Sequence, residues 1–209
     1  MYTLYGFPKT RAFRVTWALE EIGLPYEYKL VNLLKGEHRR PPFSERNPSA
    51  KVPWLECEQG GLSESAAILT YLADKHGQQE FIPKPGTFER AHFEQMMYFL
   101  MTELEQPLWY RAKHTFILPE EYRIKQMLAV SDWEFERAAD VFSTLLGEQE
   151  FVCGDTLTVA DILATHILVW AQGESLRLPE NLKQYADRMV ERPAYRKARE
   201  VEASQIPQG

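Results

Sequence analysis

Residues 3–33 read TLYGFPKTRAFRVTWALEEIGLPYEYKLVNL, an arrangement typical of a strand, a helix and a second strand. The short β-type run from residue 3 to 5 ends at Gly6 and Pro8. Gly23 ends the predicted helix, and the aromatic and aliphatic residues of 26–33 predict the second strand. Between these strands, apolar residues recur with the spacing of one helix face: Ala12, Val15, Ala18, Leu19 and Ile22. The stretch is therefore predicted to be a β-α-β unit with parallel strands.

The residues up to position 77 extend this unit. A polar, basic stretch at 35–47 predicts a short irregular helix, and the run from Pro53 to Glu58 is typical of a strand. Gly60-Gly61 is a tight-turn signal, so a hairpin partner is expected from Leu62, followed by an apolar helix. The order β-α-β, connector, β-β-α predicts an α/β thioredoxin-like domain at residues 1–77.

Strand signals are missing from the rest of the sequence. Residues 78–88, rich in proline, are interpreted as a linker, and residues 89–209 as an all-α helical bundle domain. Thr158 and Asp161 have the spacing of a capping box, which is assigned to folding rather than chemistry. Apolar stripes predict helices over Phe93 to Leu104, over Ile124 to Leu145 and from Thr158, with shorter ones over Leu182 to Met189 and from Pro193.

Composition excludes several classes of protein. The 209 residues are 44% hydrophobic and 26% charged, as in ordinary globular proteins. The N-terminus lacks a signal-peptide pattern and no span approaches the ~20 apolar residues of a membrane helix, so a cytoplasmic protein with no membrane partner is expected. The net charge of −6 disfavours a nucleic-acid partner. The two cysteines and five histidines show no ligand spacing, so no metal is expected.

Three motifs together resemble the glutathione transferases over the whole chain. The most specific is Lys51-Val52-Pro53 followed by Glu64-Ser65 at the start of an apolar helix. The second is LKGEHR at residues 34–39, similar to theta-like and bacterial members, and the third is Gly154-Asp155 followed by TVADI at 158–162. The resemblance implies a thioredoxin-like domain followed by a helical domain, and a homodimer.

The resemblance also implies that glutathione is the co-substrate and that the first domain binds it. Glu64 and Ser65 start a helix, where free N–H groups and the helix dipole favour the γ-glutamyl carboxylate. Taken alone, the same pair is simply a good helix start, and the basic residues His38-Arg39-Arg40 are simply a solvated turn. The Val52-Pro53 bond resembles the family's cis peptide, which turns the Val52 backbone toward the ligand. The implied glutathione-binding residues are His38, Arg39, Lys51, Val52, Pro53, Glu64 and Ser65.

The family places the group that stabilises the glutathione thiolate just after the first strand. Thr10 and Arg11 are the candidates, because Thr10 is the only aliphatic hydroxyl at the helix entry and the thiolate is the nucleophile. Alternatively Thr10 serves only as the helix cap, and Arg11, Lys9 or the Tyr5 phenol stabilises sulfur. The absence of cysteine at 9–11 departs from omega-like and beta-like members and disfavours a mixed disulfide with the protein.

The electrophile is expected between this segment and the helical domain. Its predicted contacts are Phe7, Tyr110, Arg111 and His114, since aromatic walls with cationic groups suit an apolar substrate with an anionic or polarised centre. The implied function is conjugation of glutathione to electrophilic small molecules, the chemistry of detoxification. Two alternatives are a glutathione-dependent peroxidase or disulfide reductase, and a non-catalytic binding or scaffold protein.

Overall fold

The structure, a computed structural model, describes residues 1–77 and 80–206. Residues 78 and 79 of the predicted linker, and 207–209 at the end of the predicted helical domain, lie outside the described residues. Contacts divide the chain into two compact units, Met1–Phe81 with Val190–Gly209, and Ile82–Met189. The predicted domain boundaries, 1–77, 78–88 and 89–209, stay a prediction, and the contact division differs from them by joining the C-terminal helix to the first unit.

The first unit contains a four-stranded mixed sheet. Its strands are β1 (Tyr2–Gly6), β2 (Tyr26–Leu30), β3 (Trp54–Cys57) and β4 (Gly60–Leu62), in the order β2-β1-β3-β4. β1 and β2 are parallel because a helix connects them, whereas the β1–β3 and β3–β4 pairs are antiparallel. The predicted β-α-β unit, hairpin and thioredoxin-like α/β class are confirmed.

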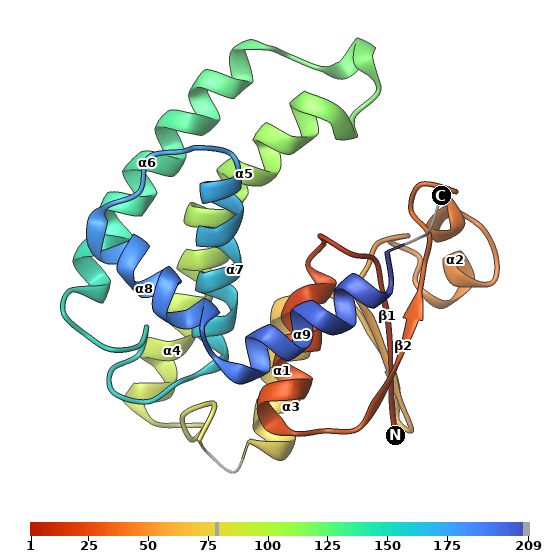
Figure 1. Cartoon of the computed structure of the whole chain (residues 1–209), viewed down its shortest axis with the longest axis horizontal. Coiled ribbons are helices and arrows are strands. Elements are labelled where there is room, and N and C mark those ends of the chain that lie inside the picture. The colour runs from red at the N-terminus through yellow and green to blue at the C-terminus, as the bar shows by residue number, and fades with distance from the viewer. Residues whose placement is uncertain (78–79, 207–209) are drawn as a thin grey trace. The chain divides into compact units, whose positions relative to one another are not determined.

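Two helices of the first unit pack against each other, and a third comes from the end of the chain. α1 (Ala12–Ile22) ends at Gly23, whose φ of 77° is the left-handed conformation that glycine adopts readily. α3 (Ser65–His76) contacts α1 on one side, and α9 (Pro193–Ser204) lies along α1 in Figure 1. Contacts with the sheet, α3 and α9 together bury every residue of α1 from position 12 to 19.

The short irregular helix predicted at 35–47 consists of two separate pieces. A 3₁₀ turn spans Glu37–Arg39, and α2 spans Phe43–Arg46. The Pro41-Pro42 pair between them supplies no backbone N–H, so one continuous helix cannot form across it.

The second unit is helical throughout its described elements, as predicted. α7 passes through the centre of the unit's core, with ten of its residues buried, and α5 and α6 run side by side in Figure 1. Ile124 and Leu145, predicted on one apolar helix stripe, are 53% and 37% exposed: Ile124 lies before α6, and in the last turn of α6 the buried residue is Leu146. The helices are α4 (Phe88–Phe99), α5 (Glu105–Ala112), α6 (Gln126–Leu146), α7 (Val159–Gly173) and α8 (Glu180–Val190), with π-helical turns at Leu100–Leu104 and Lys113–Ile117 and a 3₁₀ turn at Glu120–Tyr122.

The predicted capping box anchors the start of α7. The buried Asp161 carboxylate accepts hydrogen bonds from the backbone N–H groups of Val152 (2.7 Å) and Thr158 (2.8 Å), and from the hydroxyls of Thr158 (3.1 Å) and Tyr185 (2.7 Å). Burial raises the pKa of Asp161, while these donors favour its charged form. The motif therefore joins three segments of the second unit, which is a folding role.

No described helix is long and apolar enough to cross a membrane.

Candidate functional site

The connections that carry most of the predicted site residues meet at one end of the sheet. The parallel strands β1 and β2 both leave the sheet at this end. Because β3 is antiparallel to β1, with Trp54 opposite Tyr5, β3 enters the sheet there, and β4 leaves it there after pairing Leu62 with Leu55. The topology thus gathers candidates that are far apart in the sequence, namely residues 7–11, 36–40, 51–53 and 63–65.

The loop between β1 and α1 is held closed by Thr10. Its hydroxyl donates to the Phe7 carbonyl at 2.7 Å and accepts from the Ala12 backbone N–H at 3.2 Å. Thr10 therefore bridges the two sides of the turn that enters α1, whereas the N-cap position of α1, which the alternative interpretation gave to Thr10, is Arg11. A hydroxyl has a single proton, so Thr10 can donate to a thiolate only by releasing Phe7.

A buried carboxylate from α9 supports the same loop, and sequence reasoning missed it. Lys9 adopts a φ of 60°, and its N–H donates to Glu202 Oε1 at 2.7 Å. Glu202 is only 4% exposed, and its other oxygen accepts from Arg199 at 2.6 Å. Burial raises the pKa of Glu202, and the Lys9 and Arg199 contacts offset part of that rise. The contact joins residues 193 positions apart, so no local pattern predicts it.

The start of α3 contains a second residue that the sequence did not reveal. Ser65 is buried, and its Oγ accepts a hydrogen bond from Arg14 Nη1 at 3.2 Å. Arg14 lies on α1 and is fully buried, and its Nε has no hydrogen-bond partner among the described residues. The neighbouring Glu64 is exposed and has φ 64° and ψ 108°, a conformation that residues other than glycine rarely adopt.

The segment before β3 presents an open stretch of backbone. The Val52-Pro53 peptide is cis, as predicted. The buried side-chain amide of Asn47 donates to the Lys51 carbonyl at 2.7 Å, which fixes the approach to this peptide. Among the described residues, none hydrogen bonds to the N–H or the carbonyl of Val52. These two groups are the kind that pair with an extended peptide ligand.

The basic turn after β2 contains one neutral and one charged side chain. His38 is half-buried, and its Nδ1 has no partner among the described residues. Burial and the neighbouring Arg39 lower the pKa of His38, so its imidazole is neutral at pH 7. His38 thus offers an N–H donor or a nitrogen acceptor, whereas the exposed Arg39 carries the positive charge.

Tyr5, the phenolic alternative at the sulfur position, faces the side of the sheet that α2 covers. Its hydroxyl donates to Glu56 at 3.1 Å, and its ring packs 6.0 Å from that of Phe43. Burial raises the pKa of Tyr5, and the hydrogen bond to Glu56 raises it further. Tyr5 is therefore a protonated phenol that is already engaged on that face.

The remaining predicted residues lie on or beside α5 in the second unit, apart from Phe7. Arg111 binds Asp132 at 2.5 Å and Glu174 at 3.2 Å, so it ties α5 to neighbouring segments of the unit. Tyr110 stacks on His114, with the ring centroids 6.4 Å apart, and His114 accepts a hydrogen bond from the Ile124 N–H. Within the described part of the chain, no group of His, Cys, Asp and Glu is placed to hold a metal ion.

Two family models match the chain. The model for the glutathione S-transferase N-terminal domain matches residues 1–74, and the model for the C-terminal domain matches residues 106–193. Together they extend over both units of the structure.

Solved structures resemble the chain over nearly its whole length. Glutathione transferase URE2P6 from Phanerochaete chrysosporium, in complex with oxidized glutathione, is 29% identical with a TM-score of 0.81, covering 98% of this chain and 97% of its own. Gtt2 from Saccharomyces cerevisiae is 28% identical with a TM-score of 0.83, covering 94% and 99%. A glutathione transferase family member from Pseudomonas fluorescens Pf-5, with two glutathione bound, is 28% identical with a TM-score of 0.81, covering 94% and 91%.

Proposed function

Since the chain belongs to the glutathione transferase family, we propose that it binds glutathione at this end of the sheet and transfers its thiolate to electrophilic small molecules. The observation that carries the proposal is the convergence of an open backbone at Val52, a helix start at Ser65 and the basic Arg39. Glutathione is a peptide with a carboxylate at each end, so it needs these three kinds of partner.

The γ-glutamyl end is assigned to the start of α3. Its carboxylate accepts from the first N–H groups of the helix and from the Ser65 hydroxyl. Because Arg14 donates to Ser65 Oγ, the proton of that hydroxyl is left to point at the ligand. The exposed Glu64 carboxylate pairs with the ligand's ammonium group.

The middle and the glycine end are assigned to the neighbouring connections. The N–H and carbonyl of Val52, which precedes Pro53, pair with the cysteinyl amide of glutathione. Arg39 and Lys51 supply positive charge to the glycine carboxylate. His38 contributes a hydrogen bond rather than charge, because its pKa is lowered.

The sulfur is assigned to the loop between β1 and α1. On binding, the Thr10 hydroxyl turns from the Phe7 carbonyl to the sulfur and stabilises the thiolate, while Arg11 and Lys9 add positive potential. The thiolate then attacks an electrophilic carbon and forms a C–S bond, the leaving group takes the bonding electron pair, and the thiol proton goes to solvent.

Within the second unit, Tyr110 and His114 are assigned to the electrophile. Arg111 of the same unit has the smallest share, because it already binds Asp132 and Glu174. Phe7, in the first unit, is a separate candidate contact. A cytoplasmic homodimer completes the proposal.

A second candidate function is glutathione-dependent disulfide reduction. Its support is that one relative was crystallised in complex with oxidized glutathione, which is a disulfide, and another with two glutathione bound. The same thiolate would then attack the glutathione sulfur of a mixed disulfide: the S–S bond of the substrate breaks, its other sulfur leaves as a thiolate, and oxidized glutathione forms. Because residues 9–11 contain no cysteine, the new S–S bond joins two glutathione sulfurs and not a protein cysteine.

Calorimetric titration with glutathione, paired with ultraviolet thiolate absorbance, tests the proposal in wild type, Thr10→Val and Thr10→Ser. Wild type should bind, Thr10→Val should bind without the thiolate signal, and Thr10→Ser should restore it. A thiolate signal that survives in Thr10→Val transfers the role to Arg11 or Lys9. Absence of binding in wild type would leave a scaffold protein. Turnover of an aryl halide against that of a mixed disulfide separates the two candidate reactions.

A further inference from the structure

The C-terminal helix α9 holds the loop between β1 and α1 through a buried hydrogen bond. Lys9 of this loop has an exposed side chain, but its backbone N–H donates to Glu202 Oε1 at 2.7 Å. Glu202 lies on α9 and is buried, so water is kept from this hydrogen bond. A hydrogen bond to a carboxylate is strong, and a buried one meets little competition from solvent.

The hydrogen bond stabilises a backbone conformation that lysine does not favour. Lys9 has a φ of 60°, in the left-handed region where a Cβ atom crowds the backbone. A residue persists in this region only where its surroundings hold it there. Rotation about φ moves the N–H relative to the rest of the loop, so the Glu202 acceptor opposes a return to an ordinary conformation.

The conformation of Lys9 determines where the Thr10 hydroxyl lies. Thr10 follows Lys9 directly and bridges the turn, donating to the Phe7 carbonyl at 2.7 Å and accepting from the Ala12 N–H at 3.2 Å. Because Lys9 lies between Phe7 and Thr10, a change of its φ would move the two ends of this bridge apart. The hydroxyl assigned to the glutathione sulfur is thus held in place from α9.

The charged and titratable groups around Glu202 come from α9, β2 and the loop. Arg199 of α9 donates to Glu202 Oε2 at 2.6 Å, and the Lys9 N–H donates to Oε1. Burial raises the pKa of Tyr28 on β2 and of Tyr195 on α9, and the Glu202 carboxylate adds to both effects. Both phenols therefore stay protonated, and neither adds a negative charge beside Glu202.

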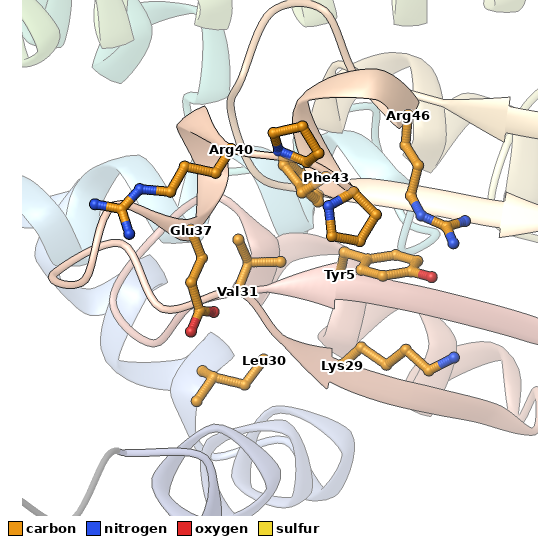
Figure 2. Close-up of a pocket in the computed structure, with 10 residues that line it drawn as sticks. Tyr5, Lys29, Leu30, Val31, Glu37, Arg40, Phe43 and Arg46 are labelled. Carbon is orange, nitrogen blue, oxygen red and sulfur yellow. The ribbon is translucent and has the colours of Figure 1, made fainter.

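The position of Tyr28 places Glu202 on the face of the sheet that α1 covers. Tyr28 pairs in register with the buried Leu4, so their side chains point to the same face. Lys29, the next residue of β2, points to the opposite face and lines the cavity shown in Figure 2. Glu202 does not belong to the lining of that cavity, so the two features are separate.

The charge and the reach of Glu202 have opposite consequences for a thiolate at this loop. A buried carboxylate near the sulfur repels a second negative charge and so disfavours the thiolate. A hydrogen bond to Lys9 favours the thiolate, because it holds the Thr10 hydroxyl where that hydroxyl can donate to sulfur. An experiment can therefore separate the two roles.

We propose that Glu202 is a positioning residue for the glutathione thiolate, acting through the Lys9 backbone on the Thr10 hydroxyl. This role rests on the proposed transferase function, which places the sulfur at this loop. The last helix of the chain thereby controls the ionisation of a thiol bound near its first strand.

Three variants separate reach from charge. Glu202→Gln keeps an oxygen for the Lys9 N–H without the charge, Glu202→Asp keeps the charge but is one methylene too short, and Glu202→Ala keeps neither. Thiolate absorbance over a range of pH gives the ionisation constant of the bound glutathione thiol. This constant should fall about tenfold in Glu202→Asp, the effect of losing one hydrogen bond to a charged sulfur. It should fall less in Glu202→Ala, where the lost charge offsets part of the effect, and should equal or exceed the wild-type value in Glu202→Gln.

Arg192→Gln is the matched control, because Arg192 pairs with Glu21 at the other end of α9. It should lower the free energy of unfolding in urea but leave the thiol ionisation constant within about twofold of wild type. A rise of the constant in both Glu202→Ala and Glu202→Gln with no fall in Glu202→Asp would make Glu202 purely electrostatic. An unchanged constant in all three variants would make it purely structural. Either result would overturn the proposal, as would an equal fall in Glu202→Gln and Glu202→Asp.

Amide hydrogen exchange at Lys9 tests the contact in the absence of glutathione. The Lys9 N–H should exchange slowly in wild type and Glu202→Gln, and about tenfold faster in Glu202→Asp and Glu202→Ala. Equal exchange in all four proteins would overturn the proposal. If wild type does not bind glutathione, the proposed transferase function fails and this role of Glu202 fails with it. If wild type binds glutathione as a thiolate and the variants share its ionisation constant, only the role of Glu202 fails.

Discussion

Glu64 stands at the start of α3 in a conformation that is costly for any residue with a Cβ atom. Its φ of 64° and ψ of 108° lie outside the regions that side-chain-bearing residues favour. A simple helix start does not require such a residue, since glycine serves there without strain. If Glu64 is present in order to bind glutathione, Glu64→Gly should raise stability and lower affinity at the same time.

The two effects can be estimated separately. Backbone strain of this kind costs about 1–3 kcal/mol, and glycine costs about 0.5–1 kcal/mol through the entropy of the unfolded chain, so Glu64→Gly should stabilise the fold by about 1 kcal/mol. Loss of the carboxylate partner of the glutathione ammonium should remove about 1–2 kcal/mol of binding free energy. That loss corresponds to an affinity roughly 5–30-fold weaker.

Urea unfolding measures the first effect and calorimetric titration with glutathione the second. Ser175→Gly is a matched control, because Ser175 is exposed, has a φ of 58° and lies in the second unit. It should stabilise the fold without altering glutathione affinity. An unchanged affinity in Glu64→Gly would refute the assignment of Glu64, and a destabilised variant would refute the argument from strain.

Four further predictions follow from other contacts. Arg14→Met should weaken glutathione binding about tenfold by calorimetry, because the buried donor to the α3 start is lost. Asp161→Asn should lower the free energy of unfolding in urea by about 2–4 kcal/mol, since the amide NH₂ meets a buried backbone N–H. Iodoacetamide should modify Cys57 before Cys153, as measured by peptide mass spectrometry. Burial raises the pKa of Cys153 to about 12. At Cys57 burial also raises the pKa, but hydrogen bonds outweigh it, so the pKa of Cys57 is lowered. The pKa of Glu202 is raised above its ordinary 4.5, so the stability that its protonation contributes should fall as pH rises from 4.5 through the folded pKa. Urea unfolding at a series of pH values measures this fall in the free energy of unfolding, which should be smaller in Glu202→Gln.

A specific result would contradict each of these four predictions. Arg14→Met with unchanged glutathione affinity would make Arg14 purely structural. An Asp161→Asn variant as stable as wild type would mean that the buried donors find other partners. Faster alkylation of Cys153 would show that its segment opens to solvent. A pH slope that is equal in wild type and Glu202→Gln would assign the titration to other carboxyl groups.

The local parts of the fold follow from sequence patterns. The apolar spacing in residues 12–22 and the glycine at 23 predict α1 with its observed ends, because one helix face and its stop signal are encoded in consecutive residues. The irregular segment at 35–47 was predicted less well. There the two prolines divide one expected helix into two short pieces.

The candidate site likewise contains residues that the sequence predicted and residues that it could not predict. Motifs indicated Val52, Glu64 and Ser65, because the chemistry of each is carried by adjacent residues. Arg14 and Glu202 could not be predicted, since an arginine and a glutamate on amphipathic helices are usually solvated. Their burial depends on contacts that span 51 and 193 positions of the chain.

The packing of α9 on α1 has a consequence for how the chain is made. Tyr195 lies against the rings of Phe13 and Trp17, at 5.1 Å and 5.0 Å, and Arg192 pairs with Glu21. A ribosome synthesises the sheet and α1 long before it reaches these partners. The first unit therefore begins to emerge early but completes its packing only after residues 82–189 of the second unit have been synthesised. A nonsense codon or a protease cut before residue 193 would accordingly destabilise the part of the chain that was synthesised first, because α1 would lose the packing of α9.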